Sequence, residues 1–265
     1  MVSRTAPRID HHRLAPPAEQ PISAQLAAAG SVRHELEDLL AAAPPDASLA
    51  VYRELLLQEN VAGKRSTVAR NKAWVHLKAR YLLDPAVPEY RTFAVAMRGT
   101  SDPGARGLLC LLMLARVNRL FREVTLECVS PHLGQANTVI DPMAIHDAVL
   151  CRVAASGAEW SPITLKRVRQ HILSSLKDFG VLRGSVTKRT VTPRVGTAVA
   201  LFAARLAKLE GLTDRQVLDA VWFQLLGLDR DRAIDVLYAA ARSGLVGFRV
   251  QADVVELNLP PEGTA

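Results

Sequence analysis

The chain has 265 residues, of which 49% are hydrophobic and 22% are charged, and this is ordinary globular usage. A chain of this length and composition can bury a core, which excludes intrinsically disordered, collagen-like and disulfide-scaffold proteins. The net charge of +7 favours a polyanionic partner, and by itself it does not choose among nucleic acid, an acidic protein and a membrane surface.

Residues 1–21 contain four prolines, the arginines Arg4, Arg8 and Arg13, and the pair His11–His12, with no apolar periodicity. This composition predicts a flexible basic tail. The histidine pair has no further ligand nearby in the sequence, so we do not expect it to hold a metal ion.

Residues 22–135 are predicted to form a helical domain that contains a helix-turn-helix pair. Apolar spacing predicts a first helical stretch that breaks near Gly30 and ends at Pro44–Pro45. The later helices are expected over residues 48–60, 66–82, 90–97 and 103–129, the second of these capped by Ser66. The most hydrophobic run, residues 107–115, is too short to cross a bilayer, and we expect it in a core helix.

Residues 136–259 are predicted to form a winged-helix-like domain, separated from the first by a loop over residues 130–140. A helix over 142–155 precedes a second one that begins at Ser161–Pro162. The buried stripe of that second helix is expected to contain Leu165, Val168, Ile172, Leu176 and Phe179. Residues 181–182 and 187–191 then alternate like two short strands, so the order is that of a winged helix.

The C-terminal stretch, residues 213–258, repeats this order and predicts a second wing-like unit. Helices are expected over residues 213–226 and 229–242, followed by a hairpin that turns near Ala252–Asp253. The predicted fold class is therefore mainly α with short β-hairpins. A helical N-terminal domain with a helix-turn-helix is followed by winged-helix-like C-terminal units.

Positive charge is concentrated in two segments. Residues 63–80 hold six basic side chains and no acidic one, and residues 161–194 hold eight basic side chains with Asp178 as the single acid. The rest of the chain is net acidic. Each segment includes the second helix of a helix-turn-helix-like pair, which is the helix that such modules lay in the major groove of DNA.

This placement predicts an interface with double-stranded DNA. Cationic side chains on the two helices and the hairpin are expected to contact phosphates, while Arg167 and Gln170 have the chemistry to contact guanine and adenine edges. The expected DNA-binding residues are Lys64, Arg65, Ser66, Thr67, Arg70, Lys72, Lys78, Thr164, Lys166, Arg167, Gln170, Ser174, Lys177, Arg183, Lys188 and Arg189.

No catalytic or cofactor motif is present in the sequence: it has no P-loop, dinucleotide turn, paired-histidine metal motif or nucleophile elbow. Asp178–Phe179–Gly180 matches the kinase metal-binding triplet in letters alone, because Phe179 closes the apolar stripe. His146 and Asp147 lack a third ligand nearby. We therefore expect no enzyme activity, no cofactor and no metal.

Cys110, Cys128 and Cys151 are expected to be buried thiols in a reducing compartment, because their number and spacing fit neither a zinc site nor a disulfide framework. The N-terminus also lacks the apolar run of a secretory signal. We expect a cytoplasmic protein without membrane contact.

Three stretches together resemble the BrxA family of BREX bacteriophage-defence systems. The first contains Glu59–Asn60, Gly63–Lys64–Arg65–Ser66–Thr67, Arg70 and Arg80–Tyr81. The second contains Trp160–Ser161, Thr164, Leu176 and Gly180–Val181–Leu182, and the third contains Trp222, Asp229, Ala241, Gly244 and the closing hairpin. The resemblance implies a helical, non-enzymatic, cytoplasmic protein that binds double-stranded DNA beside a methyltransferase and ATPases.

The leading hypothesis is a sequence-tolerant double-stranded DNA-binding component of a BREX complex. Three alternatives remain open at this point. A winged-helix transcription regulator would recognise palindromic half-sites about one turn apart. An assembly adaptor would bind an acidic protein through the same basic segments, and an RNA-binding protein would use them on RNA backbone.

Overall fold

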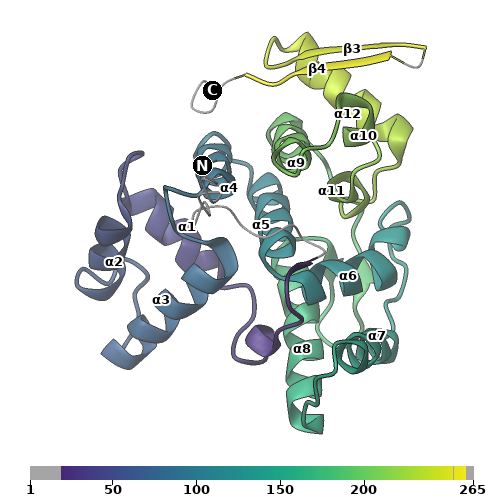
Figure 1. The fold of residues 1–265 in the computed structure, drawn as a ribbon. Helices are drawn as coiled ribbons and strands as arrows, with labels where there is room; N and C mark the ends of the chain where they lie inside the picture. Colours follow the sequence, from purple (N-terminus) through teal and green to yellow (C-terminus); the bar gives the residue numbers. More distant parts are fainter. Residues whose placement is uncertain (1–18, 253, 261–265) are drawn as a thin grey trace, which may run out of the picture.

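A computed structural model describes residues 19–252 and 254–260 of the chain, and it confirms the predicted fold class. The N-terminal half is helical (Figure 1). Its elements are η2 (Ala24–Ala27), α1 (Arg33–Ala42), α2 (Leu49–Leu57), α3 (Thr67–Tyr81), α4 (Pro88–Arg98), α5 (Pro103–Val117), α6 (Arg119–Cys128) and η3 (Ser130–His132). The rest comprises α7 (Pro142–Ala155), α8 (Pro162–Asp178), β1 (Leu182–Arg183), β2 (Arg189–Thr190), α9 (Thr197–Leu209), α10 (Asp214–Val217), α11 (Val221–Gln224), α12 (Arg230–Arg242), β3 (Gly247–Gln251) and β4 (Val254–Asn258).

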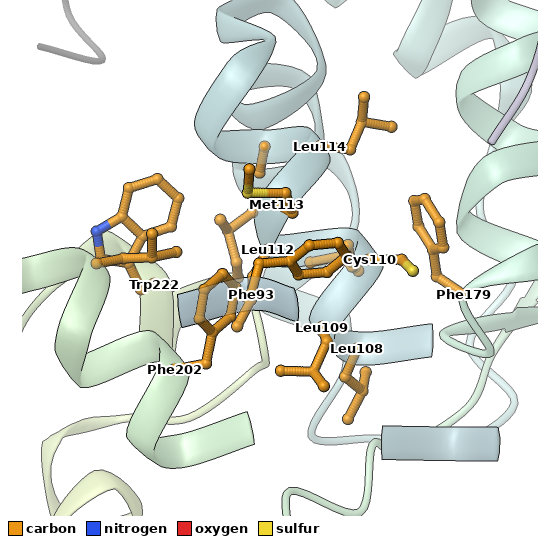
Figure 2. Packing of buried hydrophobic residues seen from close by; sticks show 14 of the residues in the cluster. Phe93, Leu108, Leu109, Cys110, Leu112, Met113, Leu114, Phe179, Phe202 and Trp222 are labelled. Atoms are coloured by element: carbon orange, nitrogen blue, oxygen red, sulfur yellow. The ribbon is translucent and has the colours of Figure 1, made fainter. Parts of the chain in front are cut away.

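Helix α5 is the centre of the core, as the apolar run over residues 107–115 predicted. Every residue from Leu108 to Arg116 is buried, because α3, α4, α6, α8 and α9 all pack against this helix. Figure 2 shows Phe202 and Trp222 on one side of α5 and Phe179 on the other. Among the described residues, no helix is long and apolar enough to cross a membrane.

The predicted single helix over residues 103–129 is wrong, because Asn118 divides it into α5 and α6. The backbone of Asn118 is extended (φ −121°, ψ 100°), and its N–H still bonds to the carbonyl oxygen of Leu114. Its side-chain oxygen accepts a 2.8 Å hydrogen bond from the N–H of Phe121 and so caps α6. One asparagine thus ends one helix and begins the next.

The β1–β2 hairpin follows α8 and pairs antiparallel, with Leu182 opposite Thr190. Its outer strand also pairs with an extended segment that precedes α7, because Thr190 N donates to Thr138 O at 2.9 Å and Ile140 N to Lys188 O at 2.9 Å. The order along the chain is therefore α6, extended segment, α7, α8 and hairpin.

The C-terminal elements differ from the prediction in two places. Residues 213–226 form two short helices, α10 and α11, instead of one. Helix α9 is absent from the predicted elements, although it packs against α4, α5 and α12. The β3–β4 hairpin is present as expected, with Gln251 opposite Val254.

Both edges of the β3–β4 hairpin carry side-chain caps. The hydroxyl of Tyr238 accepts a 3.1 Å hydrogen bond from the N–H of Val250, and Asp214 Oδ2 accepts one of 2.9 Å from the N–H of Leu257. Capped edges of this kind disfavour pairing with a strand of another chain.

A buried ionic cluster joins the C-terminal elements to the core. Arg116 lies 2.8 Å from Glu89 and 3.9 Å from Glu210, which also accepts a 3.2 Å hydrogen bond from Trp222 Nε1. Burial raises the pKa of Glu210 despite the attraction of Arg116. The cluster connects α4, α5, the end of α9 and α11.

The expectation of three buried thiols is correct for Cys110 alone. Burial raises the pKa of Cys110 to about 12. Cys128 is half-buried, and Cys151 is exposed because it lies on the face of α7 that no described element covers.

Candidate nucleic-acid interface

The start of α3 is set by a clamped loop. Asn60 lies in the left-handed region (φ 57°), and its side chain accepts a 2.8 Å hydrogen bond from Lys64 N and donates one of 3.0 Å to Lys64 O. Ser66 then caps α3 as predicted, because its hydroxyl accepts a hydrogen bond from Ala69 N at 3.2 Å.

Lys64 is an internal partner of this loop. Its Nζ lies 2.5 Å from Glu35 Oε1 of α1, and both side chains are largely covered. Burial opposes ionisation of Glu35, but the hydrogen bond and charge of Lys64 outweigh it, so that the pKa of Glu35 lies below its ordinary value. The sequence motif around Asn60 and Lys64 therefore has a structural explanation.

Two arginines of the first basic segment are also engaged by the fold. Arg70 donates to Thr67 Oγ1 at 3.0 Å and to Gln58 O at 3.4 Å. Arg80 is only 2% exposed and donates to Ala29 O at 2.5 Å, so this member of the first basic segment adds no charge to the surface. Burial lowers the pKa of Arg80.

The outer face of α3 is left with three exposed cations, Arg65 just before the helix and Lys72 and Lys78 on it. Lys78 lies 5.7 Å from the centre of the Trp74 ring. Two exposed valines, Val68 and Val75, share this surface. The sequence prediction missed both valines, although their spacing of seven residues places them on one face of a helix.

Helix α8 begins as predicted, with Ser161 as N-cap and Pro162 at the first helical position. The hydroxyl of Ser161 accepts a 3.3 Å hydrogen bond from Thr164 N and lies 2.9 Å from the Thr164 hydroxyl, so Thr164 belongs to the cap. All five residues of the predicted apolar stripe are buried, namely Leu165, Val168, Ile172, Leu176 and Phe179.

The opposite face of α8 exposes Lys166, Arg167, Gln170 and Lys177. Ser174 is different, because it is half-buried and its hydroxyl donates to His171 O at 3.2 Å. A Cβ on Gly30 would come within 3.1 Å of the Ser174 hydroxyl, so the backbone at Gly30 covers this position.

The β1–β2 hairpin extends the basic surface of α8. Arg183 donates to the side chain of Asn137, and Arg189 donates to its carbonyl oxygen at 3.0 Å. Lys188 Nζ donates to Gly184 O at 2.8 Å, and Gly184 itself has a positive φ of 99°. The hairpin cations thus stabilise their own turn and the preceding loop, while Arg183 and Arg189 remain exposed.

The segment of residues 23–33, which we call the N-terminal strap, connects α3 to α8. Arg80 of α3 donates to Ala29 O, while His171 Nδ1 of α8 lies 2.5 Å from Leu26 O. At its other end, Ser31 Oγ donates to Asp178 Oδ2 at 2.6 Å. Figure 1 shows η2 between the two helices. The strap therefore fixes the spacing of α3 and α8.

Burial and neighbouring cations lower the basicity of one histidine of α3. Burial, together with the positive charges of Arg80 and Lys72, lowers the pKa of His76. His76 is therefore neutral at physiological pH and adds no charge to the basic surface.

No group of three or more His, Cys, Asp or Glu side chains in the described part of the chain has the geometry of a metal site. A groove between α6 and α7 does bring Cys128, His132, Asp147 and Cys151 to one surface. The pair His11–His12 lies outside the described residues.

A family model described as BrxA matches residues 20–205. The chain belongs to the BrxA family. This membership identifies it as a protein associated with BREX systems. No curated protein and no solved structure matches the chain.

The BrxA match begins at residue 20, three residues before the strap, and ends within α9, so it includes both basic helices and the β1–β2 hairpin. It ends before α10, so the C-terminal stretch of the resemblance, which includes Trp222 and Asp229, lies beyond the matched residues. The two basic elements therefore belong to the part that the family shares.

Proposed function

We propose that this BrxA-family chain is a non-enzymatic, cytoplasmic component of a BREX complex. It binds double-stranded DNA mainly through contacts to the sugar-phosphate backbone of the DNA. The main support is the set of exposed cations on two helices that the strap holds at fixed spacing. These cations are Arg65, Lys72, Lys78, Lys166, Arg167 and Lys177. Helix α3 contains no acidic residue, and the single acid of α8, Asp178, lies at its last position and accepts a 2.6 Å hydrogen bond from Ser31.

The order of elements from α6 to β2 supports the same proposal. A helix, an extended segment, two helices and a hairpin follow one another as in a winged helix, in which the helix equivalent to α8 enters the major groove. Arg167 and Gln170 then lie on the face that reaches base edges, and Arg183 and Arg189 lie where the wing reaches phosphates.

The residues of the α2–α3 loop act differently in this proposal. Lys64, Ser66, Thr67 and Arg70 have partners within the loop and the start of α3, and they shape the approach to DNA. Arg65 and Lys72 make the direct phosphate contacts.

The decisive experiment reverses the charge of Lys166, Arg167 and Lys177 to Glu in one variant. These side chains are exposed and make no side-chain hydrogen bond or ion pair with other described residues, so we expect an unchanged thermal midpoint and a lost gel shift with duplex DNA. A matched control reverses Arg53, Arg232 and Arg242, which are exposed on α2 and α12 and change the net charge equally.

The proposal predicts that the control retains binding. Unchanged binding by the α8 variant, or equal loss in both variants, would show that α8 is not the DNA-binding element. A pull-down that survives nuclease treatment and depends on the same α8 residues would favour the assembly adaptor. Stronger binding to double-stranded RNA would favour the RNA-binding protein.

The winged-helix order also keeps a transcription regulator as a second candidate. Selection of binding sites from random duplexes separates the two. A palindromic motif with half-sites about one turn apart supports the regulator, and a shallow preference supports the BREX component.

A further inference from the structure

The outer face of α3 exposes two large apolar side chains that the fold does not use. Val68 is 64% exposed and Val75 is 61% exposed. Neither packs in the core, and valine is a weaker helix former than alanine, so local helix stability does not explain them either. They lie two helical turns apart on one face, with exposed Asn71 between them.

The charge around the two valines indicates what covers them. Arg65, Lys72 and Lys78 flank them, and α3 contains no acidic residue. An uncharged apolar groove of a protein would not complement these positive charges. Duplex DNA does complement them, because phosphates line both sides of its major groove. The apolar group that the major groove presents is the C5 methyl of thymine.

We propose that α3 recognises A·T base pairs because Val68 and Val75 contact thymine methyl groups in the major groove. This inference rests on the proposed function, since it requires α3 to enter duplex DNA. Asn71 lies between the valines. Its Nδ2 donates a 3.0 Å hydrogen bond to Thr67 O, which leaves Oδ1 to accept one from the N6 amino group of the adenine in the same base pair.

The geometry of α3 fits this role. Val68 is the second residue of α3 and so lies in the first turn, which is the part of a recognition helix that contacts base edges. A spacing of seven helical residues is about 10 Å along the axis, and this equals about three base-pair steps of 3.4 Å. The clamped Asn60 loop and the strap hold both ends of the helix in place.

The test replaces thymine with deoxyuridine, which removes the methyl group without changing charge or hydrogen bonding. Two A·T-rich duplexes of the same sequence, one with thymine and one with deoxyuridine, are titrated against the wild-type chain. One methyl-sized contact changes affinity by about fourfold. Two such contacts multiply to about 16-fold, so we expect the wild type to bind the thymine duplex about 16-fold more tightly.

The variant V68A V75A should bind the two duplexes equally, because it lacks the side chains that contact the methyl groups. Alanine is the stronger helix former, so this variant is expected to keep its thermal midpoint. The matched control is V254A, since Val254 is 63% exposed on β4, away from the basic helices, and it should behave as the wild type.

Equal wild-type binding to both duplexes would overturn the inference and leave the proposed function intact. A thymine preference that persists in V68A V75A would overturn it as well, because the preference would then come from DNA shape. Absence of binding to either duplex by the wild type would overturn the proposed function itself.

Discussion

Helices α3 and α8 begin alike and use their charges differently. Each has a serine N-cap, and each lies in a basic segment. In the first segment Lys64 pairs with Glu35, and Arg80 is buried against the strap. In the second, Lys166, Arg167 and Lys177 point outward and pair with no other described residue.

The difference shows that a count of basic residues overestimates the charge of a binding surface when some of these residues are buried or paired within the fold. In the first segment, basic side chains stabilise the loop before α3 and the contact of α3 with the strap. In the second segment, the apolar residues of α8 pack in the core and its cations remain at the surface. Measurements on the two segments should therefore separate stability from DNA binding.

The largest effect that tests this contrast is the salt dependence of DNA binding. If the six exposed cations of α3 and α8 contact phosphates, log affinity should fall with log salt at a slope of about −5. A rise from 50 to 200 mM salt would then weaken binding by about 10³-fold. Titration by fluorescence anisotropy measures the slope.

Replacing Lys166, Arg167 and Lys177 with Ala should reduce this slope by about half. Replacing the internally paired Lys64 with Ala should change the slope little. A flat salt response in the wild type would contradict a backbone-directed interface.

The second effect is on stability and concerns Arg80. Arg80→Ala should lower the free energy of unfolding by about 3 kcal/mol, because it removes a buried side chain together with its hydrogen bonds to the carbonyl oxygens of Gln25 and Ala29. Urea denaturation measures the loss. Lys78→Ala, on the exposed side of the same helix, serves as the control and should change stability by less than about 0.5 kcal/mol.

A result in which Arg80→Ala weakens DNA binding without loss of stability would show that Arg80 acts at the surface. The hydrogen bonds of Arg80 to the strap would then not explain its role.

The smallest effect concerns pH. Because the pKa of Glu35 is lowered in the folded chain, its stabilisation is present above the ordinary glutamate pKa of 4.5 and is lost as pH falls through the folded pKa. Glu35→Gln should cost at most about 1 kcal/mol at pH 7, since the pair with Lys64 is partly exposed. The difference from wild type should be smaller near pH 3, because a falling pH protonates the Glu35 carboxylate.

Denaturation of both proteins at the two pH values measures this difference. Glu54→Gln, a change at an exposed carboxyl on α2, should show no such pH dependence. A wild-type advantage that grows as the pH falls would contradict the ion pair.

Much of the fold was predictable because local patterns and tertiary packing agree. The stripe from Leu165 to Phe179 has the period of one helix face, and every member is buried. Caps such as Ser66 and Ser161 lie directly before apolar periodicity, so sequence alone places both helix starts. These signals are local, and the fold keeps them.

The rest depends on partners distant in the chain. Nothing near Arg80 in sequence indicates that residues 25–29 will bury it, and nothing near Lys64 indicates Glu35. In the sequence, Asn118 lies within a long helical stretch, and only the structure shows that its side chain caps α6. The site is predictable as a charge pattern, while the separation of structural from exposed cations needs the packed molecule.

The strap also constrains how the molecule acquires its shape. It precedes α8 in the chain, and its contacts with His171 and Asp178 join residues about 145 positions apart. Contacts of such long sequence separation form late in folding. The two basic helices therefore cannot be aligned until α8 has been made, and a chain without α8 lacks the paired surface that a duplex would meet.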